Sequence, residues 1–364
     1  MSLEQKQKVL AALAGGAERV FELQSKLTSL RGLGPDNGGT GEQDKADYLE
    51  GWLRSFGITD IEHVDAPDAR VPSGKRPNLI VRVPGKSEKT LWILGHMDVV
   101  PAGDESLWRT DPWTVTRDEN DPDLIYGRGI EDNQQAIVCG CMVAAALKER
   151  GMLDGLCGAI RLCAVPAEEL LEIEYRRKLK AEGKIKYFGG KSEFLYRGYF
   201  DDVDIAFMVH TSNSFTARAG SNGCIAKNII YKGVAAHAGG APWAGKNALY
   251  AATCGINAVN AIRETLKEAD LIRIHPIITH GGDMVNAIPD KVCLESYVRG
   301  KNFEGMVEAN KKMNRALIGA AVSLNLNIEI IDIPGYAPLV NDKNMIQLVS
   351  EAAEAIGVKF SYHD

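Results

Sequence analysis

The chain has 364 residues, of which 45% are hydrophobic and 25% are charged, and its formal net charge is −6 at pH 7. This length and composition are typical of a globular protein with two domains, or with one large domain and an insertion. The negative charge and the lack of a strongly basic cluster argue against nucleic acid as a partner, and no apolar stretch approaches the roughly eighteen residues that span a bilayer.

The N-terminus has early charges at Glu4, Lys6 and Lys8, and it lacks the charged, apolar and small-residue regions of a signal peptide. The seven cysteines are odd in number and include no CxxC pair. That pattern argues against a disulfide framework and fits a reducing compartment. We therefore expect a cytoplasmic protein.

Apolar side chains at helical spacing predict a pair of helices within residues 3–30, and a further helix over 43–56 follows a Gly-rich stretch. That stretch lacks the Gly-Lys-Ser/Thr ending of a phosphate loop, and no clear strand precedes it, so we predict a loop rather than a nucleotide site. Residues 78–83 and 90–94 then alternate with turn residues as consecutive strands.

The stretch LWILGHMDVVP at residues 91–101 joins a short apolar run to His96, with Asp98 two residues further on. Such a run is typical of a buried strand in a parallel sheet, and ligands in open α/β sheets bind beyond the carboxyl ends of the strands. His96 is therefore a candidate metal ligand. The alternative is a core histidine that is satisfied by hydrogen bonds.

Asp132 falls just before a predicted helix over 136–150, where an aspartate could equally be an N-cap that needs no metal. A second apolar strand, 159–165, is followed by Pro and Ala and then by Glu168 and Glu169. Two adjacent carboxylates at the end of a buried strand are costly to hold without a cation, although a solvated turn is the alternative.

A third apolar strand is predicted at 203–209, and it ends at His210. Three strands thus end on potential ligands, and a fourth candidate stands at a helix start between two of them. Imidazole nitrogens and carboxylate oxygens suit zinc and, less well, manganese or cobalt. One aspartate among such ligands can bridge two ions about 3.5–4 Å apart, an arrangement that activates water against an amide or ester.

From residue 217 the pattern changes to a β-α-β-β-α-β order, which predicts an inserted α+β domain of the split βαβ type over 217–332. We expect residues 1–216 and 333–364 to form the catalytic domain, an α/β fold with a mostly parallel sheet and helices on both faces. A helix is predicted over 345–356.

Six motifs carry a family resemblance, and they stand in the family's order: GHMDVVP, GRGIEDNQQ, PAEEL, FMVHT, AAHAGGAPWAGKNAL and GGDMVNAIPDKVCLESYVRG. Together they resemble the di-zinc metallopeptidases and amidohydrolases that include aminoacylase, acetylornithine deacetylase, succinyl-diaminopimelate desuccinylase and glutamate carboxypeptidase. The resemblance covers nearly the whole chain. Its first half is similar to the dipeptidase and deacylase branch and its second half to the aminobenzoyl-glutamate hydrolase branch, so the substrate stays open.

The resemblance implies two zinc ions per chain, with cobalt or manganese as alternatives, and these ligands: His96, Asp132, Glu169 and His210. In that assignment Asp132 bridges the two ions and Glu168 is the general base. Asp98 holds the imidazole of His96 in the tautomer that a ligand needs.

The resemblance also implies a homodimer through the inserted domain, in which His237 reaches across to polarise the scissile carbonyl. Asn286 and Arg299 match positions that hold a substrate carboxylate in relatives, a task that suits the fork of an arginine. As alternatives, His237 is a loop histidine that caps the next helix and Arg299 is a surface residue. The chain departs from the family near its end, because His363 lacks the context of the last zinc ligand. We expect either a missing C-terminal segment or a weakly held second zinc.

These observations predict metal-dependent hydrolysis of an amide bond next to a free carboxylate, in a small peptide or an N-acyl amino acid. The alternative from another class is a non-catalytic relative that binds an amino-acid-like ligand or a protein. Glu168 and Asp132 argue against it, because a binding protein has no need of a base. A nucleotide-dependent enzyme is a more distant alternative.

Overall fold

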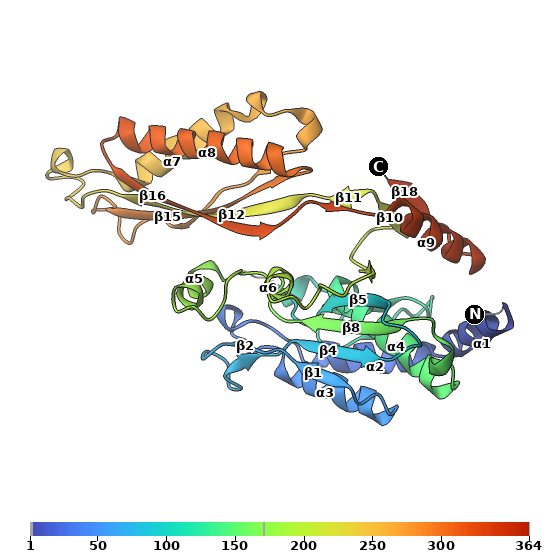
Figure 1. Ribbon diagram of the computed structural model, residues 1–364. Coiled ribbons are helices and arrows are strands. Elements are labelled where there is room, and N and C mark those ends of the chain that lie inside the picture. The colour runs from blue at the N-terminus through green and yellow to red at the C-terminus, as the bar shows by residue number, and fades with distance from the viewer. Residues whose placement is uncertain (1–2, 170–171, 364) are drawn as a thin grey trace. The chain divides into compact units, whose positions relative to one another are not determined.

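The computed structural model describes residues 3–169 and 172–363, and its contacts divide the chain into two compact units, Met1–Thr211 and Ser212–Asp364 (Figure 1). We call them the first and the second unit and describe each by itself.

The first unit is built on a five-stranded sheet with the strand order β1-β4-β8-β5-β9. Its strands in that order are β1 (Ile61–His63), β4 (Leu79–Val83), β8 (Ala159–Val165), β5 (Thr90–His96) and β9 (Ile205–Phe207). The neighbours β8, β5 and β9 run parallel, whereas β4 is antiparallel to β8 and β1 is antiparallel to β4. Because β5, β8 and β9 run in the same direction, the segments that follow them all begin at the carboxyl ends of these strands and meet there.

Helices cover both faces of this sheet, as the alternation of side chains along the strands requires. On one face Val81 and Leu162 pack in a buried core against these helices: α2 (Ala17–Ser29), α3 (Gln43–Ser55) and α4 (Gln135–Glu149). On the other face Trp92 packs with Phe194 of α6 (Gly190–Tyr196). The first helix, α1 (Leu3–Ala14), contacts α4. The predicted α/β fold class is confirmed.

Short elements connect the larger ones. Four strands form two small hairpins, β2 (Ala66–Pro67) with β3 (Lys75–Arg76) and β6 (Thr116–Arg117) with β7 (Ile125–Tyr126). A further helix and several single turns complete the first unit: α5 (Ile173–Ala181), η1 (Pro35–Asn37), η2 (Glu105–Leu107), η3 (Ile130–Gln134) and η4 (Leu153–Gly155).

The second unit follows the predicted β-α-β-β-α-β order, except that the first of the two strands between the helices is divided into two short strands, β13 (Arg273–Ile274) and β14 (Ile277–His280). Its other elements are β12 (Gly223–Lys232), α7 (Ala248–Ala261), β15 (Lys291–Gly300), α8 (Phe303–Ser323) and β16 (Asn327–Tyr336). All pairings in this sheet are antiparallel, in the order β13-β15-β12-β16 with β14 beside β15. Three single turns lie between these elements: η5 (Pro242–Ala244), η6 (Arg263–Thr265) and η7 (Glu268–Asp270).

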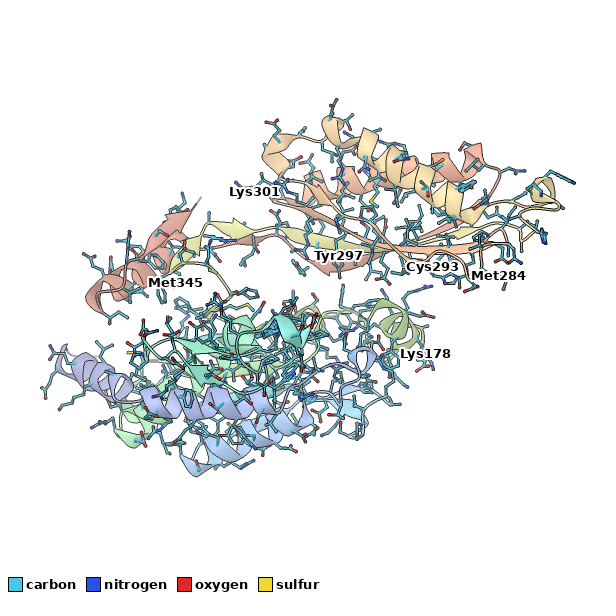
Figure 2. All side chains as sticks on the ribbon, turned by 180° about the vertical axis from the view of Figure 1, so that it is seen from behind. Lys178, Met284, Cys293, Tyr297, Lys301 and Met345 are labelled. Atoms are coloured by element: carbon cyan, nitrogen blue, oxygen red, sulfur yellow. The ribbon has the colours of Figure 1, made fainter. Side chains whose placement is uncertain are left out.

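One face of the second sheet is covered by α7 and α8, where Ile229 and Leu294 contribute to a buried core with Leu317. Alternate residues of β15 lie on the other face, and Figure 2 shows Cys293 and Tyr297 on the side away from the two helices. The second sheet is thus packed with helices on one side.

The C-terminal segment pairs with the start of the second unit. Strand β18 (Ser361–His363) runs parallel to β10 (Thr216–Arg218), and β17 (Leu339–Val340) is antiparallel to β11 (Gly220–Ser221). The helix α9 (Lys343–Ala355) contacts β10. The assignment of 333–364 to a catalytic domain with 1–216, and of 217–332 to an inserted domain, stays a prediction.

The strand predicted at 203–209 is shorter in the structure. Strand β9 spans Ile205–Phe207 and pairs with Leu91, Trp92 and Ile93 of β5. It lies at the edge of the sheet and has one partner, so its ladder ends where that pairing ends. His210 therefore lies in irregular backbone three residues beyond the strand.

Within the described part of the chain, no helix combines the length and the apolar character that crossing a membrane requires.

The close packing of α4 on the sheet can be tested at Gly140, where a Cβ atom would lie 2.8 Å from Leu162 Cδ2. We expect Gly140→Val to lower the stability of the first unit by about 1–3 kcal/mol through overpacking. Urea unfolding followed by tryptophan fluorescence reports mainly on this unit, because four of the five tryptophans lie in it and the fifth, Trp243, is largely exposed in the second unit.

Gly51 is the matched control, because it lies in α3 and a Cβ atom there meets nothing within 4 Å. Gly51→Ala should raise stability by about 0.5–1 kcal/mol through helix propensity. A Gly140→Val midpoint equal to or above that of the wild type would contradict the packing.

Candidate metal centre

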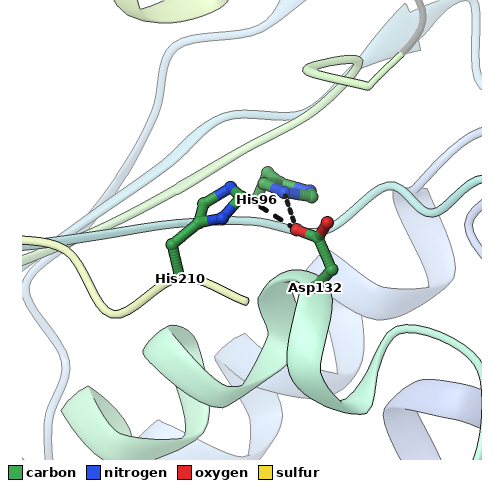
Figure 3. A group of neighbouring side chains, drawn as sticks. All are labelled: His96, Asp132 and His210. Atoms are coloured by element: carbon green, nitrogen blue, oxygen red, sulfur yellow. Dashed lines mark hydrogen bonds and ion pairs between the residues drawn. The ribbon is translucent and has the colours of Figure 1, made fainter. Parts of the chain in front are cut away.

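Three side chains meet beyond the carboxyl ends of the parallel strands in the first sheet. His96 ends β5, Asp132 lies in the turn η3 before α4, and His210 follows β9. The Nε2 atoms of His96 and His210 lie 3.2 Å and 3.5 Å from the same oxygen, Oδ1 of Asp132 (Figure 3). Among the described residues these three form a group that could hold a metal ion. His96 is fully buried, whereas the other two side chains are partly exposed, so the group is accessible from one side.

The local fold explains why these three residues meet. Strand β5 is parallel to β8, and His96 stands beside Val165. Gly95 allows α4 to approach β5, since a Cβ atom there would lie 2.7 Å from Ile137 Cγ1. The buried amide of Asn133 donates from Nδ2 to the carbonyl oxygen of Val209 at 2.6 Å. This bond ties the turn that carries Asp132 to the residue before His210.

The geometry fits a zinc ion. Donor atoms bound to zinc at about 2.0–2.2 Å in a tetrahedral array lie roughly 3.3–3.6 Å apart, close to the separations measured from Asp132 Oδ1. Nδ1 of His96 is 3.0 Å from the carbonyl oxygen of Asp98 and 3.5 Å from its carboxylate. With Nδ1–H donating to Asp98, the lone pair of Nε2 is free to bind a metal.

The electrostatics point the same way. Burial raises the pKa of Glu169, and the negative charge of Asp132 raises it further, to about 7. Burial alone would lower the pKa of His96, but hydrogen bonds with Asp132 and Asp98 outweigh burial and raise that pKa to about 10. The hydrogen bond from His96 lowers the pKa of Asp132. In the metal-free protein, protons on Glu169 and His96 therefore offset the negative charge of the carboxylates, which a divalent cation would otherwise balance.

Both predicted glutamates lie beside the three-residue group. Glu169 lies close enough to Asp132 for the negative charge of Asp132 to raise the pKa of Glu169. Oε2 of Glu168 is 3.9 Å from His96 Nε2, and its Oε1 accepts a hydrogen bond from Lys191 Nζ at 3.0 Å. One carboxylate oxygen of Glu168 is therefore held by Lys191, and the other lies towards His96 of the three-residue group.

The turn that carries these glutamates is held through its backbone. Ala167 has a φ of 52°, in the left-handed region that a non-glycine residue seldom adopts. The N–H groups of Glu168 and Glu169 donate to the two oxygens of Asp98, at 3.0 Å and 2.9 Å. Asp98 is buried, so its carboxylate both satisfies two donors and lies beside His96.

Buried charged side chains also form hydrogen bonds with the backbone of the turn that carries Glu168 and Glu169. The N–H of Ala167 donates to Glu42 Oε1 at 3.2 Å, and Glu42 forms a buried ion pair with Arg76. Arg176 donates from Nη2 to the carbonyl oxygen of Ala167 at 2.9 Å. Lys45 donates to the carbonyl oxygen of Met97 at 2.8 Å, and burial lowers its pKa to about 7. Charged side chains thus fix both Met97, which precedes Asp98, and Ala167, which precedes Glu168.

The sequence reasoning missed these supporting residues, although one signal was available. Glu42 stands four residues before Ala46 and seven before Leu49, so helical spacing places it on the buried stripe of α3. Lys45 is likewise four residues before Leu49. For Arg176 and Lys191 the sequence offers no comparable signal.

The second unit brings two of the three remaining candidates together. Nδ1 of His237 accepts hydrogen bonds from the N–H groups of Gly239 and Gly240, and the residue pairs with Ala287 in an isolated bridge. The carbonyl oxygen of Asn286 accepts from Ala238 N at 2.9 Å, so the two loops lie side by side. Both side chains are exposed.

Arg299 lies elsewhere in the second unit. It is paired with Cys224 and Arg273 near the end of β15, whereas Lys291, at the start of that strand, is close to the Asn286 loop. The eight-residue separation along β15 corresponds to about 26 Å. The second unit therefore keeps Arg299 away from its own His237. The side chain of His363 lies outside the described residues.

The sequence is similar to those of known hydrolases. The sequence model of peptidase family M20/M25/M40 matches residues 92–363. An uncharacterised metallohydrolase of Methanococcus maripaludis is 33% identical over 136 residues, which are 36% of this chain and 32% of that protein. The Xaa-Arg dipeptidase of Homo sapiens is 28% identical over 227 residues, which are 61% of this chain and 48% of that protein. The chain thus spans about a third to a half of the length of these curated relatives.

The fold has a counterpart among solved structures. The dipeptidase Dug1p from Saccharomyces cerevisiae superposes with a TM-score of 0.72, at 17% identity, over 98% of this chain and 86% of that one. A likeness at this identity shows the fold alone.

The double acceptor role of Asp98 predicts a loss of metal affinity in Asp98→Asn. One carboxylate oxygen becomes an NH₂ group, which would face the N–H of Glu168 or Glu169 and repel it. We expect zinc affinity to fall about 10–100-fold, as measured by competition with a chelating dye. Asp104→Asn is the control, because Asp104 is an exposed cap of η2. Equal affinities of the two variants would contradict this role of Asp98.

The raised pKa values of Glu169 and His96 predict that bound zinc stabilises the fold more strongly as pH rises. In the metal-free fold, Glu169 binds its proton up to about pH 7 and His96 up to about pH 10, above the ordinary values of 4.5 and 6.5. The stability that these protons contribute is present at low pH and is lost as pH rises through the folded values. Zinc must displace them, so its binding strengthens as pH rises.

We therefore expect the difference in Tm between zinc-loaded and chelator-treated protein to increase from pH 6 to pH 8 at constant free zinc. Calorimetry in buffers of different ionisation enthalpy should show proton release on binding. A constant or decreasing Tm difference would contradict the assignment of both groups to the site.

Proposed function

The chain belongs to peptidase family M20/M25/M40, and we propose that it hydrolyses an amide bond next to a free carboxylate, in a dipeptide or an N-acyl amino acid, with zinc as its cofactor. The observation that carries the proposal is the group of His96, Asp132 and His210 with a carboxylate oxygen of Glu168 3.9 Å from His96 Nε2. Hydrolase relatives, a metallohydrolase and a dipeptidase among them, support metal-dependent hydrolysis in general.

Two zinc ions per chain are proposed, with cobalt or manganese as alternatives. His96 and His210 would hold one ion, Glu169 the other, and Asp132 both. When bound, such an ion polarises a carbonyl and lowers the pKa of water. The nitrogen and oxygen donors suit zinc, and the pKa of Glu169, which burial and the charge of Asp132 raise to about 7, gives a physical reason for a cation at this position.

The proposed role of Glu168 is supported by its placement, and those of His237, Asn286 and Arg299 by the family resemblance. Glu168 would accept a proton from the attacking water and donate it to the leaving amine, because one of its oxygens faces the three-residue group while Lys191 holds the other. We propose that His237 polarises the carbonyl across a homodimer formed by the domain 217–332, and that Asn286 and Arg299 contribute to carboxylate binding. The cytoplasmic location stays a prediction.

The test combines metal content with turnover. Elemental analysis of the purified protein would be paired with amine release from alanyl dipeptides with neutral, basic or acidic C-terminal residues, and from N-acetyl amino acids. About two zinc per chain, with hydrolysis that a chelator abolishes and zinc restores, supports the proposal. Absence of both metal and turnover would favour a non-catalytic binding protein.

Replacement of Glu168 separates chemistry from metal binding. We expect Glu168→Gln to lower kcat by at least about 10²–10⁴-fold, because the amide cannot take up a proton, while metal content and the circular dichroism spectrum are retained. Glu182→Gln is the matched control, since Glu182 also pairs with a lysine, Lys184, at 2.8 Å. A Glu168→Gln variant with near wild-type kcat would exclude this role.

A further inference from the structure

The proposed substrate presents a problem of charge. Its free carboxylate must lie close to the reacting carbonyl, because a single Cα atom separates it from the scissile amide. The first unit lines this site with four carboxylates: Asp98, Asp132, Glu168 and Glu169. The two zinc ions proposed above balance these four negative charges but leave no excess positive charge for the carboxylate of the substrate, so that anion needs a further cation beside it.

The second unit offers an incomplete answer. Within one chain, Arg299 is a long way along β15 from the loops that hold His237 and Asn286, so all three can act at one site only if both subunits of the proposed dimer contribute. An amide such as that of Asn286 can donate a hydrogen bond but carries no charge. A cation in the first unit, beside Glu168 itself, would solve the problem without the second unit.

Most basic side chains around the site are committed to its interior. Lys45 is 1% exposed and donates to Met97 O and Gln134 Oε1. Arg76 and Arg176 are buried behind the turn, where they hold Glu42 and Ala167. These groups position the backbone of the site and lie out of reach of a substrate.

Lys191 differs from them in exposure. Its Nζ donates to Glu168 Oε1 at 3.0 Å, and its side chain is 29% exposed, next to a Glu168 side chain that is 32% exposed. An ammonium carries three donors, of which Glu168 uses one. The nearest further contact is a weak one, with Met208 Sδ at 3.9 Å. Lys191 is therefore a cation at the accessible side of the site with capacity for a second anion.

The backbone below Lys191 is well anchored. The residue lies in the first turn of α6, and Phe194 of the same helix is buried against Trp92 and Val165 of the sheet. The lysine thus projects from an element that is fixed to the same strands, β5 and β8, that carry His96 and the glutamate turn. Its distance from Glu168 is set by the core.

We propose that Lys191 binds the free carboxylate of the substrate while it remains paired with Glu168, so that one ammonium bridges the base and the substrate. The inference rests on the proposed function and deepens it, because it assigns a specificity-determining residue. It adds a contact from the first unit to those proposed above for Asn286 and Arg299.

The test compares each hydrolysed panel substrate as the free acid and as its C-terminal carboxamide, in wild type, Lys191→Met and Lys191→Arg. We expect Lys191→Met to lower kcat/KM for the acid about 10–100-fold more than for the carboxamide, mostly through KM. Lys191→Arg should retain most of the preference for the acid. Isothermal titration with the product amino acid, which needs no turnover, should show the same loss of affinity in Lys191→Met.

Lys184→Met is the matched control, because Lys184 forms an ion pair of similar length with Glu182 in the same segment and should leave the preference unchanged. If Lys191→Met lowers the rates for acid and carboxamide equally, Lys191 positions Glu168 alone and the inference is wrong. An unchanged preference would overturn it as well. Wild-type protein that cleaves neither form would instead contradict the proposed function, and the inference would fail with it.

Discussion

The carboxylate of Asp98 is the constraint on which the rest of the site depends. It is buried, and a buried charge is stable only if donors surround it. Two successive N–H groups in the turn after β8 donate to the carboxylate, and the ring of His96 lies with Nδ1 3.5 Å from it and 3.0 Å from the backbone carbonyl oxygen of the same residue. Satisfying one anion therefore fixes the imidazole and the glutamate turn relative to each other.

Charged side chains behind the turn make this arrangement rigid. The Glu42–Arg76 pair and Arg176 bind the two polar backbone atoms of Ala167, which would otherwise have little reason to hold a positive φ. Such a conformation costs of order 1–3 kcal/mol and persists when its surroundings determine it. Local backbone strain at the turn is thus balanced by contacts that span more than a hundred residues of sequence.

The sequence predicted most of what depends on periodicity and on strand ends. The strands 78–83, 90–94 and 159–165, the split βαβ order and the placement of His96 and Asp132 at one edge all agree with the structure. Two kinds of feature escaped it. The third strand was predicted too long, because its extent depends on one neighbour at the sheet edge. The ionic contacts of Arg176 and Lys191 depend on how distant segments fold together, which no local pattern encodes. The ligand roles inferred from family resemblance stay predictions.

The segment between Glu169 and β9 carries α5 and α6, and it leaves the sheet at one fixed point and returns at another. The candidate metal ligands lie outside it, on β5, on η3, on the turn after β8 and after β9. Changes at Lys191 in α6 would therefore alter which side chain meets Glu168, whereas changes at Arg176 in α5 would also release the turn that carries Glu169. If Lys191 binds the substrate as proposed, α6 contributes to substrate choice while the strand ends hold the metal, so related proteins can differ in substrate and keep the same metal site.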